Sequence, residues 1–339
     1  MRSSHKAAKC LVLAVMIGLI AGGVSCKRDG PGEPAAGPPG TPKPSPPAKK
    51  WHIGFSQCTA TEPWRVLFNQ LLEREAAKHP EVELEILDAQ DRTEEQNAQM
   101  EALINKGVDA ILISPKESAG LTGVVKRATE AGIPVIVLDR DVETEDYACF
   151  VGGDNTEIGR EAGKFAVEVL GGEGKAKGKI YEIWGGKGST PAHERHDGFA
   201  EVVGKEPGIT LVGEQDGDWK QKKGYDIMEA ALKIEKDIDI VYAHNDPMAF
   251  GAYLAAVDAE RDEEIKFVGI DANPDEGCKW VKEGKLTATF VYPPPGEKGL
   301  QVALEILEGG SPEQQRIYLP TRRITQETVD DYLRDKGML

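Results

Sequence analysis

The sequence has few cysteines, few aromatic residues and fewer basic than acidic residues. Its five cysteines among 339 residues show no CxxC spacing, which excludes zinc-ribbon and thioredoxin-like motifs and argues against a disulfide framework. The 41 Lys and Arg face 57 Asp and Glu, and the net charge of −16 argues against nucleic acid as a partner. With 40% hydrophobic, 6% aromatic and 29% charged residues, the chain is typical of a globular protein large enough for two domains.

Enzyme motifs are also missing. The Gly-rich segment 185–190 lacks the residue order of a phosphate-binding loop, no GxSxG elbow occurs, and Cys58 has no assigned base. His193 and His196 lack the HExxH spacing of a zinc site, and no third ligand is evident. We therefore expect no metal, no cofactor and no catalytic residues. A carboxylate pair of the glycosidase type stays open as an alternative in so acidic a chain.

The N-terminus carries the features of an export signal. Residues 1–9 contain three bases and no acid, and the apolar run 10–24 follows directly. This run is shorter than the ~20 apolar residues that a membrane-spanning helix needs. We therefore expect residues 1–25 to be a secretory signal peptide.

The end of this signal, Gly-Val-Ser-Cys at 23–26, resembles the lipobox of bacterial lipoproteins, although Gly23 stands where Leu is usual. The resemblance implies lipidation of Cys26 and attachment to a membrane, and a plain secretory signal is the alternative. Twelve of the twenty residues 29–48 are Pro or Gly, a composition that cannot form a packed core. We expect residues 26–50 to be the lipidated cysteine and an extended tether.

From residue 51 the chain alternates β-rich runs with helical patterns. The expected strands are mostly continuous apolar runs, at 53–56, 82–87, 110–114, 134–138, 179–184, 238–243, 267–270 and 287–292. The expected helices lie between them, at 64–78, 94–106, 118–131, 158–170, 222–234, 248–259 and 275–282. Buried strands separated by helices indicate parallel βαβ units. This many units favours an α/β fold of two doubly wound parallel-sheet lobes, with a TIM barrel as the alternative.

Polar side chains follow several of the expected strands. They include carboxylates, arginines, an amide and two indoles, at Trp64, Arg65, Asp139, Arg140, Arg195, Trp219, Asn245 and Asp271. In open parallel sheets, ligands bind beyond the carboxyl ends of the strands. Carboxylates accept and guanidinium groups donate charge-assisted hydrogen bonds, and indoles cover the apolar face of a sugar ring. The pattern therefore predicts a hydroxyl-rich ligand.

The ordered segments GFSQ, PWR, GIPVIVLDRD, VGGDN, HERHDGF, GDWKQKKG, VYAHNDPMAFGA, GIDANPD, GKLTATF and IYLP resemble the type I periplasmic sugar-binding proteins of ABC transporters. GFSQ, PWR, VYAHND and IYLP are most similar to the galactofuranose-binding members. The resemblance covers about residues 51–330. It implies two lobes, 51–153 with 293–320 and 154–292 with 321–339, joined by a hinge that closes over a monosaccharide.

In the first lobe, the resemblance implies that Asp139 and Arg140 bind ring hydroxyls and that Trp64 fills an aromatic position. Arg65 stands where ribose-type members have a second aromatic residue, and Tyr292 where they have a hinge glutamine, which argues against ribose itself. A surface ion pair between Asp139 and Arg140 is the alternative for those two residues.

In the second lobe, the resemblance implies that Arg195, Asn245 and Asp271 bind the remaining hydroxyls and that Trp219 stacks on the sugar. The expected function is that of a monomeric substrate-binding protein, periplasmic or at the cell surface, that presents a monosaccharide, with furanoses among the candidates, to an ABC permease. A sugar sensor that contacts a chemoreceptor or membrane kinase is the alternative. A DNA-binding regulator is not expected, because no N-terminal helix-turn-helix precedes the fold.

Overall fold

A computed structural model describes residues 50–339 of the chain. These residues form two six-stranded sheets, which we call sheet A and sheet B. The strands of sheet A, in spatial order, are β11 (Arg316–Leu319), β5 (Cys149–Gly153), β4 (Val135–Leu138), β3 (Ala110–Ser114), β1 (Trp51–Gln57) and β2 (Val82–Asp88). The helices that pack on it are α1 (Pro63–Ala76), α2 (Thr93–Lys106), α3 (Ser118–Glu130) and α9 (Gly296–Leu307). Sheet A and these helices are lobe A.

Sheet B has the same arrangement of strands. Their spatial order is β12 (Arg323–Thr325), β10 (Ala288–Phe290), β9 (Lys266–Val268), β8 (Ile240–Ala243), β6 (Lys177–Trp184) and β7 (Gly208–Asp216). The associated helices are α4 (Asn155–Val169), α5 (Thr190–Val203), α6 (Gln221–Ile234), α7 (Asp246–Asp258), α8 (Lys279–Lys282) and α10 (Val329–Asp335), with a π-helical turn at Pro274–Cys278. Sheet B and these helices are lobe B.

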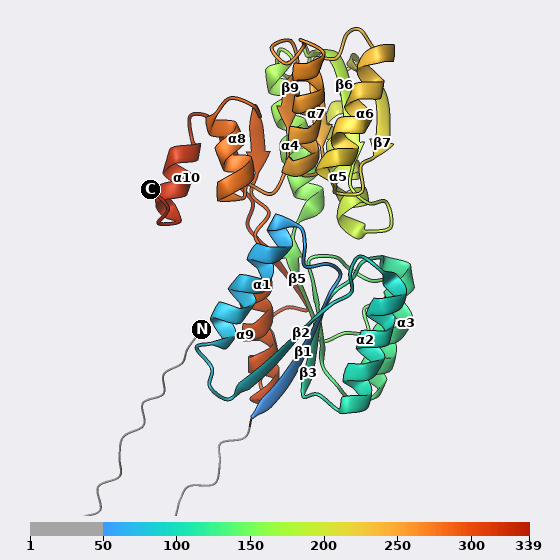
Figure 1. The fold of residues 1–339 in the computed structure, drawn as a ribbon, viewed down its shortest axis with the longest axis vertical. Coiled ribbons are helices and arrows are strands. Elements are labelled where there is room, and N and C mark those ends of the chain that lie inside the picture. Colours follow the sequence, from blue (N-terminus) through green and yellow to red (C-terminus); the bar gives the residue numbers. More distant parts are fainter. Residues whose placement is uncertain (1–49) are drawn as a thin grey trace, which may run out of the picture. The chain divides into compact units, whose positions relative to one another are not determined.

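Both sheets are doubly wound. All neighbours in sheet A are parallel, and in sheet B only the edge strand β12 is antiparallel. Alternate residues of a strand point to opposite faces, so Leu112 packs toward α1 and α9, while Ile111 and Ile113 pack toward α2 and α3 (Figure 1). Two open sheets covered on both faces confirm the predicted α/β fold class and exclude the TIM barrel.

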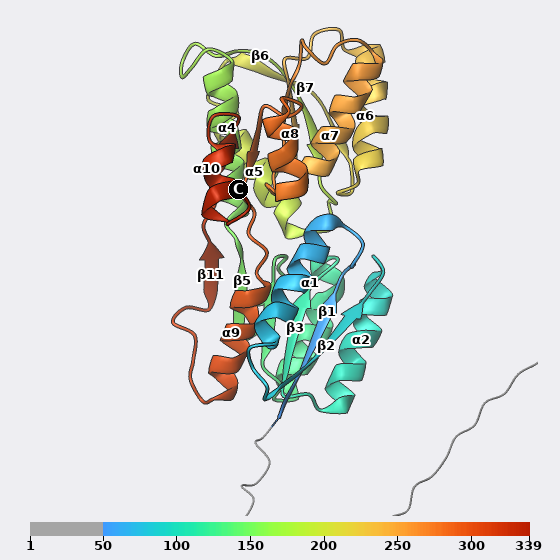
Figure 2. The same cartoon turned by 60° about the vertical axis from the view of Figure 1, so that its left-hand side comes forward.

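The chain passes between the sheets three times. It leaves sheet A after β5 and enters α4, returns from β10 to α9, and leaves again from β11 to β12. Figure 2 shows β5 and β11 beside each other, where two of these passages begin. The strands at these passages lie at one edge of their sheets: β11 and β5 in sheet A, and β12 and β10 in sheet B. The three passages therefore lie on the same edge of each sheet.

Seven elements escaped the sequence patterns: β5, β7, β11, β12, α5, α9 and α10. The edge strand β7 has no buried residue, and its apolar residues are interrupted by Thr210 and followed by three polar residues, so it offers no continuous apolar run. The short strands β11 and β12 pair only at a sheet edge, where burial constrains the sequence weakly. Among the elements that were predicted, the bounds differ by a few residues; the helix expected at 64–78 spans Pro63–Ala76.

Local sequence signals explain how the helices near the sheet edges begin. Pro63 starts α1, where its fixed φ suits the first turn and its missing N–H is no loss. Asp154 caps α4 by accepting a hydrogen bond from the backbone N–H of Glu157. Within residues 50–339, the helices are all too short or too polar to cross a bilayer. The expected signal peptide, tether and lipidation of Cys26 lie outside the described residues.

Candidate functional site

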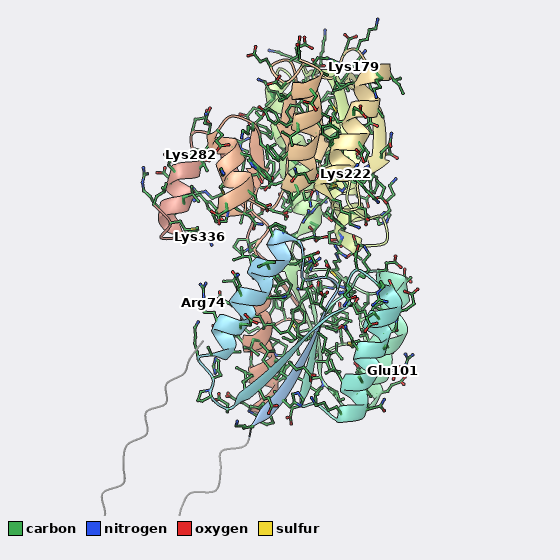
Figure 3. All side chains as sticks on the ribbon, viewed as in Figure 1. Arg74, Glu101, Lys179, Lys222, Lys282 and Lys336 are labelled. Carbon is green, nitrogen blue, oxygen red and sulfur yellow. The ribbon has the colours of Figure 1, made fainter. Side chains whose placement is uncertain are left out.

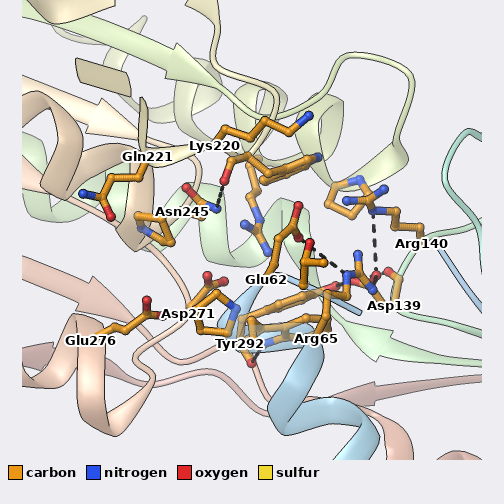
Figure 4. Close-up of a pocket in the computed structure, with 17 residues that line it drawn as sticks. Glu62, Arg65, Asp139, Arg140, Lys220, Gln221, Asn245, Asp271, Glu276 and Tyr292 are labelled. Carbon is orange, nitrogen blue, oxygen red and sulfur yellow. Dashed lines mark hydrogen bonds and ion pairs between the residues drawn. The ribbon is translucent and has the colours of Figure 1, made fainter. Parts of the chain in front are cut away.

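A cavity of about 270 Å³ lies between the two lobes. Its lining comes from the loops that follow strands of both sheets and from the first turns of the helices after them. All nine residues singled out from the sequence line it. The lining residues are Thr61, Glu62, Pro63, Trp64, Arg65, Asp139, Arg140, Pro191, Arg195, Trp219, Lys220, Gln221, Asn245, Pro247, Asp271, Glu276 and Tyr292. Figure 4 shows these side chains converging from both lobes. The cavity therefore places charged, amide and aromatic groups around one small volume.

Asp139 is the counter-ion of two buried arginines. Its carboxylate lies 2.6 Å from Nη1 of Arg65 and 3.8 Å from Nε of Arg140, and it accepts hydrogen bonds from Ser114 and Tyr292. Burial alone would raise the pKa of Asp139, but the charges of Arg65 and Arg140 lower it below its usual value. The alternative of a surface ion pair is wrong, because Asp139 and Arg140 are 2% and 4% exposed.

Tyr292 connects the chain passage after β10 to lobe A. Its ring stacks on Trp64, with centroids 5.1 Å apart, and the indole N–H of Trp64 donates to the Tyr292 carbonyl oxygen. The Tyr292 hydroxyl donates to Oδ1 of Asp139 over 2.7 Å. A Cβ at Gly153 would overlap the Tyr292 ring, so glycine is needed for this close approach. One face of Trp64 is thus occupied by protein.

Arg195 reaches the cavity from α5. Its Nε donates to Asn155 and its Nη1 to the carbonyl oxygen of His244, while Nη2 has no hydrogen-bond partner within residues 50–339. The guanidinium centre lies 4.4 Å from the Tyr292 ring centroid and 5.4 Å from that of Trp219. Two protein contacts therefore hold the guanidinium in place and leave one nitrogen for another partner.

Trp219 lies in a left-handed turn after β7, with a φ of 64°. A Cβ at Gly185 would overlap its indole, so Gly185 allows the ring to lie flat against the loop after β6. Asn245 holds this turn: its amide donates to the Trp219 carbonyl oxygen, and its Oδ1 caps α7 by accepting from the backbone N–H of Met248. The asparagine therefore joins the cavity wall to a helix N-terminus.

Asp271 is a buried carboxylate to which no side chain or backbone group of residues 50–339 donates a hydrogen bond. Burial raises its pKa well above the usual value, and the nearby carboxylate of Asp246 raises it further. Burial also raises the pKa of Glu276, which lines the same wall. In Figure 4, Asp271 and Glu276 lie on one side of the cavity, and Arg65 and Arg140 lie on the other.

Sequence reasoning missed eight of the lining residues, among them Glu62, Lys220, Gln221 and Glu276. Each lies within four residues of a predicted site residue, except Glu276, which lies five residues after Asp271. Proximity along the chain was therefore the available signal. It was insufficient because residues next to a strand end can point toward or away from the ligand.

A buried network of Glu182, His196 and His244 lies behind Arg195. The Glu182 carboxylate is hydrogen-bonded to Nδ1 of His196 at 3.0 Å and to Nε2 of His244 at 2.9 Å. Burial would raise the pKa of Glu182, but these two histidines lower it. With Glu214, Glu182 and His196 have the spacing of metal ligands. These polar atoms already satisfy one another, and Glu214 accepts from the indole of Trp184, so the hydrogen bonds explain the cluster without an ion.

The comparisons with known proteins agree with this geometry. Residues 53–311 match the periplasmic binding protein domain family. The ribose import binding protein of Bacillus subtilis is 34% identical over 282 residues, which cover 82% of this chain and 88% of that protein. The galactofuranose-binding protein of Escherichia coli is 31% identical over 296 residues, covering 84% and 92%.

Solved structures extend the likeness. The fructose-binding periplasmic domain of a hybrid two-component system is 38% identical, with a TM-score of 0.81 and coverage of 85% of this chain and 94% of that one. A Mycobacterium smegmatis protein in complex with β-D-fucofuranose is 32% identical, with a TM-score of 0.79 and coverage of 85% and 95%. The two-sheet fold, the cavity between the lobes and these matches together establish that this chain belongs to the type I periplasmic sugar-binding proteins.

Proposed function

We propose that this protein captures a monosaccharide between its lobes and presents it to an ABC permease. The lobes close about the three chain passages, and the closed form is what the permease recognises. The protein acts outside the cytoplasm, exported by residues 1–25 and anchored through a lipid on Cys26. It binds its ligand without converting it.

The proposal rests on two hydrogen-bonding groups of the cavity wall, one a donor and one an acceptor, that have no protein partner in the described part of the chain. Nη2 of Arg195 and the carboxylate of Asp271 have no protein partner within residues 50–339, although both residues are at least 91% buried. Both groups line the cavity, and a polyhydroxylated ligand can satisfy them by donating to the acid and accepting from the arginine. The cavity of about 270 Å³ is below the usual range for drug-sized ligands and suits a single sugar ring.

A furanose is the ring form that we favour. The relatives named for galactofuranose and β-D-fucofuranose are 31% and 32% identical to this chain. In this chain, Tyr292 and Arg65 lie against the indole of Trp64, so part of its surface is covered by protein and is not open to the ligand. A five-membered ring needs less of this wall than a six-membered ring in its chair form.

A sugar panel tests the proposal directly. The purified protein is screened by thermal denaturation against pentoses and hexoses, including methyl furanosides that cannot change ring size. A cognate sugar at 100 times its Kd stabilises the native state by about 2.7 kcal/mol, which raises the Tm by roughly 5–8 °C. The sugar should be recovered chemically unchanged. A panel that gives no shift would refute monosaccharide binding, and conversion of the sugar would support an enzyme instead.

A matched pair of arginine variants then localises the binding. Arg140→Met removes a guanidinium from the cavity lining, and loss of a charged hydrogen bond weakens affinity roughly 10- to 150-fold. Arg127→Met, on the exposed face of α3, is the control, and its affinity should stay within twofold of wild type. Equal affinities for both variants would place the sugar elsewhere.

A sensor is the second candidate, because the fructose-binding relative at 38% identity is a domain of a hybrid two-component system. In that role the closed form would contact a membrane kinase or chemoreceptor. Sugar-dependent stimulation of ATP hydrolysis by the permease, with both reconstituted in one membrane, favours transport. Sugar-dependent kinase activation without that stimulation favours sensing.

A further inference from the structure

Four charged residues form a closed ring across the mouth between the lobes. Asp91 and Lys116 belong to lobe A, where they follow β2 and β3, and Asp218 and Lys220 belong to lobe B, between β7 and α6. We call this set the ion ring. It lies next to the cavity without belonging wholly to it, since only Lys220 of the four lines the cavity.

Positive and negative charges alternate around the ion ring. Within lobe A, Nζ of Lys116 lies 2.6 Å from Asp91, and within lobe B, Nζ of Lys220 lies 2.7 Å from Asp218. Across the lobes, Lys220 lies 3.0 Å from Asp91 and Lys116 lies 3.5 Å from Asp218. Each lysine therefore contacts one carboxylate of its own lobe and one of the other.

This alternation has a consequence for opening and closing. When the lobes separate, the pairs within each lobe can persist, so no charge is left alone. When the lobes approach, two further attractive contacts form, and in this arrangement the side chains of Lys116 and Asp218 are 14% and 23% exposed. The contacts between lobes therefore add an attraction that exists only in the closed arrangement.

The ion ring lies at the edge opposite to the chain passages. Asp91 follows β2 and Asp218 follows β7, which are the edge strands farthest in sheet order from β11 and β12. A rotation about the passages separates this edge by the largest distance. Contacts placed here therefore discriminate between open and closed arrangements more strongly than contacts near the hinge.

The backbone around the ion ring is held in an uncommon conformation. Asp91 and Asp218 have φ angles of 64° and 49°, in the left-handed region that non-glycine residues rarely adopt. Burial would raise the pKa of Asp218, but its hydrogen bonds with Lys220 and Lys223 and the charge of Lys116 lower it to about 2. Both carboxylates are thus presented at turns and stay ionised over the physiological pH range.

The ion ring is linked to the cavity through Trp219. This residue lies between Asp218 and Lys220 in the chain and lines the cavity, so a ligand that orders its indole also orders both ring residues of lobe B. Two further hydrogen bonds join the lobes: the backbone N–H of Ser118 donates to the carbonyl oxygen of Gly188, and that of Asp141 donates to Oγ1 of Thr190.

We propose that the ion ring of Asp91, Lys116, Asp218 and Lys220 is a latch that holds the lobes closed over the bound ligand and slows its release. The latch rests on the proposed function, since it presumes a protein that opens and closes. It acts on the dissociation rate, because its contacts between lobes exist only after closure. Its strength falls as salt rises, because the ring is partly exposed and is screened.

The first test measures sugar release by stopped-flow fluorescence at 20 mM and 500 mM salt. Asp91→Asn keeps a residue type that tolerates the left-handed turn and should release the sugar about two- to tenfold faster at low salt. Lys116→Met should act in the same direction. Wild type at high salt should approach the rate of Asp91→Asn, and the association rate should change little.

Two variants on lobe A are the controls. Glu101→Gln removes an acid on the outer surface of α2 (Figure 3), where it lies 2.6 Å from Arg127. Lys126→Met removes a lysine that pairs with Asp146. Neither pair spans the lobes, so both controls should release the sugar at the wild-type rate. A latch is refuted if Asp91→Asn has the same release rate and salt dependence as Glu101→Gln.

A second measurement needs no sugar and separates failure of the latch from failure of the proposed function. Small-angle X-ray scattering of the ligand-free protein should give a larger radius of gyration at 500 mM than at 20 mM salt. Asp91→Asn should show the larger value at both. Identical scattering under all conditions refutes the latch, whereas a salt-dependent radius with no sugar binding in the panel keeps the latch and refutes monosaccharide capture.

Discussion

Replacing Asp139 by asparagine tests the central electrostatic feature of the site. The wild-type carboxylate neutralises Arg65 and Arg140, which are 3% and 4% exposed, and it accepts from Ser114 and Tyr292. The amide keeps the shape but removes the nearest counter-ion of Arg65, which is left with Glu62 at 3.9 Å from its Nε. Removing one partner of a buried ion pair costs about 3–5 kcal/mol.

This cost should appear as a lower melting temperature. At about 2–3 °C per kcal/mol for a chain of this size, Asp139→Asn should melt roughly 6–15 °C below wild type at pH 7. Because the pKa of Asp139 is lowered in the folded state, the ion pair stabilises the protein above the unfolded-state pKa of about 3.9. The stabilisation is lost as the pH falls through the folded-state pKa, so the two proteins should converge only below about pH 4.

Two further variants make the result specific. The double variant Asp139→Asn with Arg65→Gln removes the stranded charge and should recover part of the lost stability. Asp146→Asn, an exposed acid 3.5 Å from Lys126 in the same lobe, is the control and should melt within about 1 °C of wild type. If Asp139→Asn melted with the control, or if the double variant were less stable than the single one, the counter-ion role would be wrong.

Three other changes have defined outcomes. Asp271→Asn should raise the Tm by roughly 2–6 °C at pH 8 and by less at pH 5. The reason is that the folded-state pKa of Asp271 is raised, so the wild-type protein loses stability as the pH rises above the unfolded-state pKa of about 3.9. A variant that melts below wild type at every pH would contradict this. Tyr292→Phe removes the donor to Asp139 but keeps the stacking on Trp64, so calorimetry should show a loss of about 1.5–3 kcal/mol, and an unchanged Tm would disprove the contribution of this hydrogen bond. Cys26→Ser should abolish incorporation of labelled fatty acid, and equal labelling of both proteins would rule out the lipid anchor.

The chain's fold class and the location of its cavity could be predicted from local patterns. Continuous apolar runs such as 110–114 require burial on both faces, which only a covered parallel sheet provides. Polar residues directly after such runs must then gather at one edge, because the carboxyl ends of parallel strands meet there. This explains why Asn245 and Asp271, which follow strands of sheet B, lie together, whereas only the family resemblance implied that Asp139, after a strand of sheet A, shares their cavity.

The pairing of groups within the cavity could not be predicted in this way. Neighbourhood in sequence pointed to an ion pair of Asp139 with Arg140, yet the shorter contact is with Arg65, which is 74 positions away. Tyr292 meets Trp64 only because a chain passage returns beside α1. The ion ring likewise joins residues more than 120 positions apart along the chain. Side-chain partners depend on how two separately packed sheets meet, and local periodicity carries no information about that arrangement.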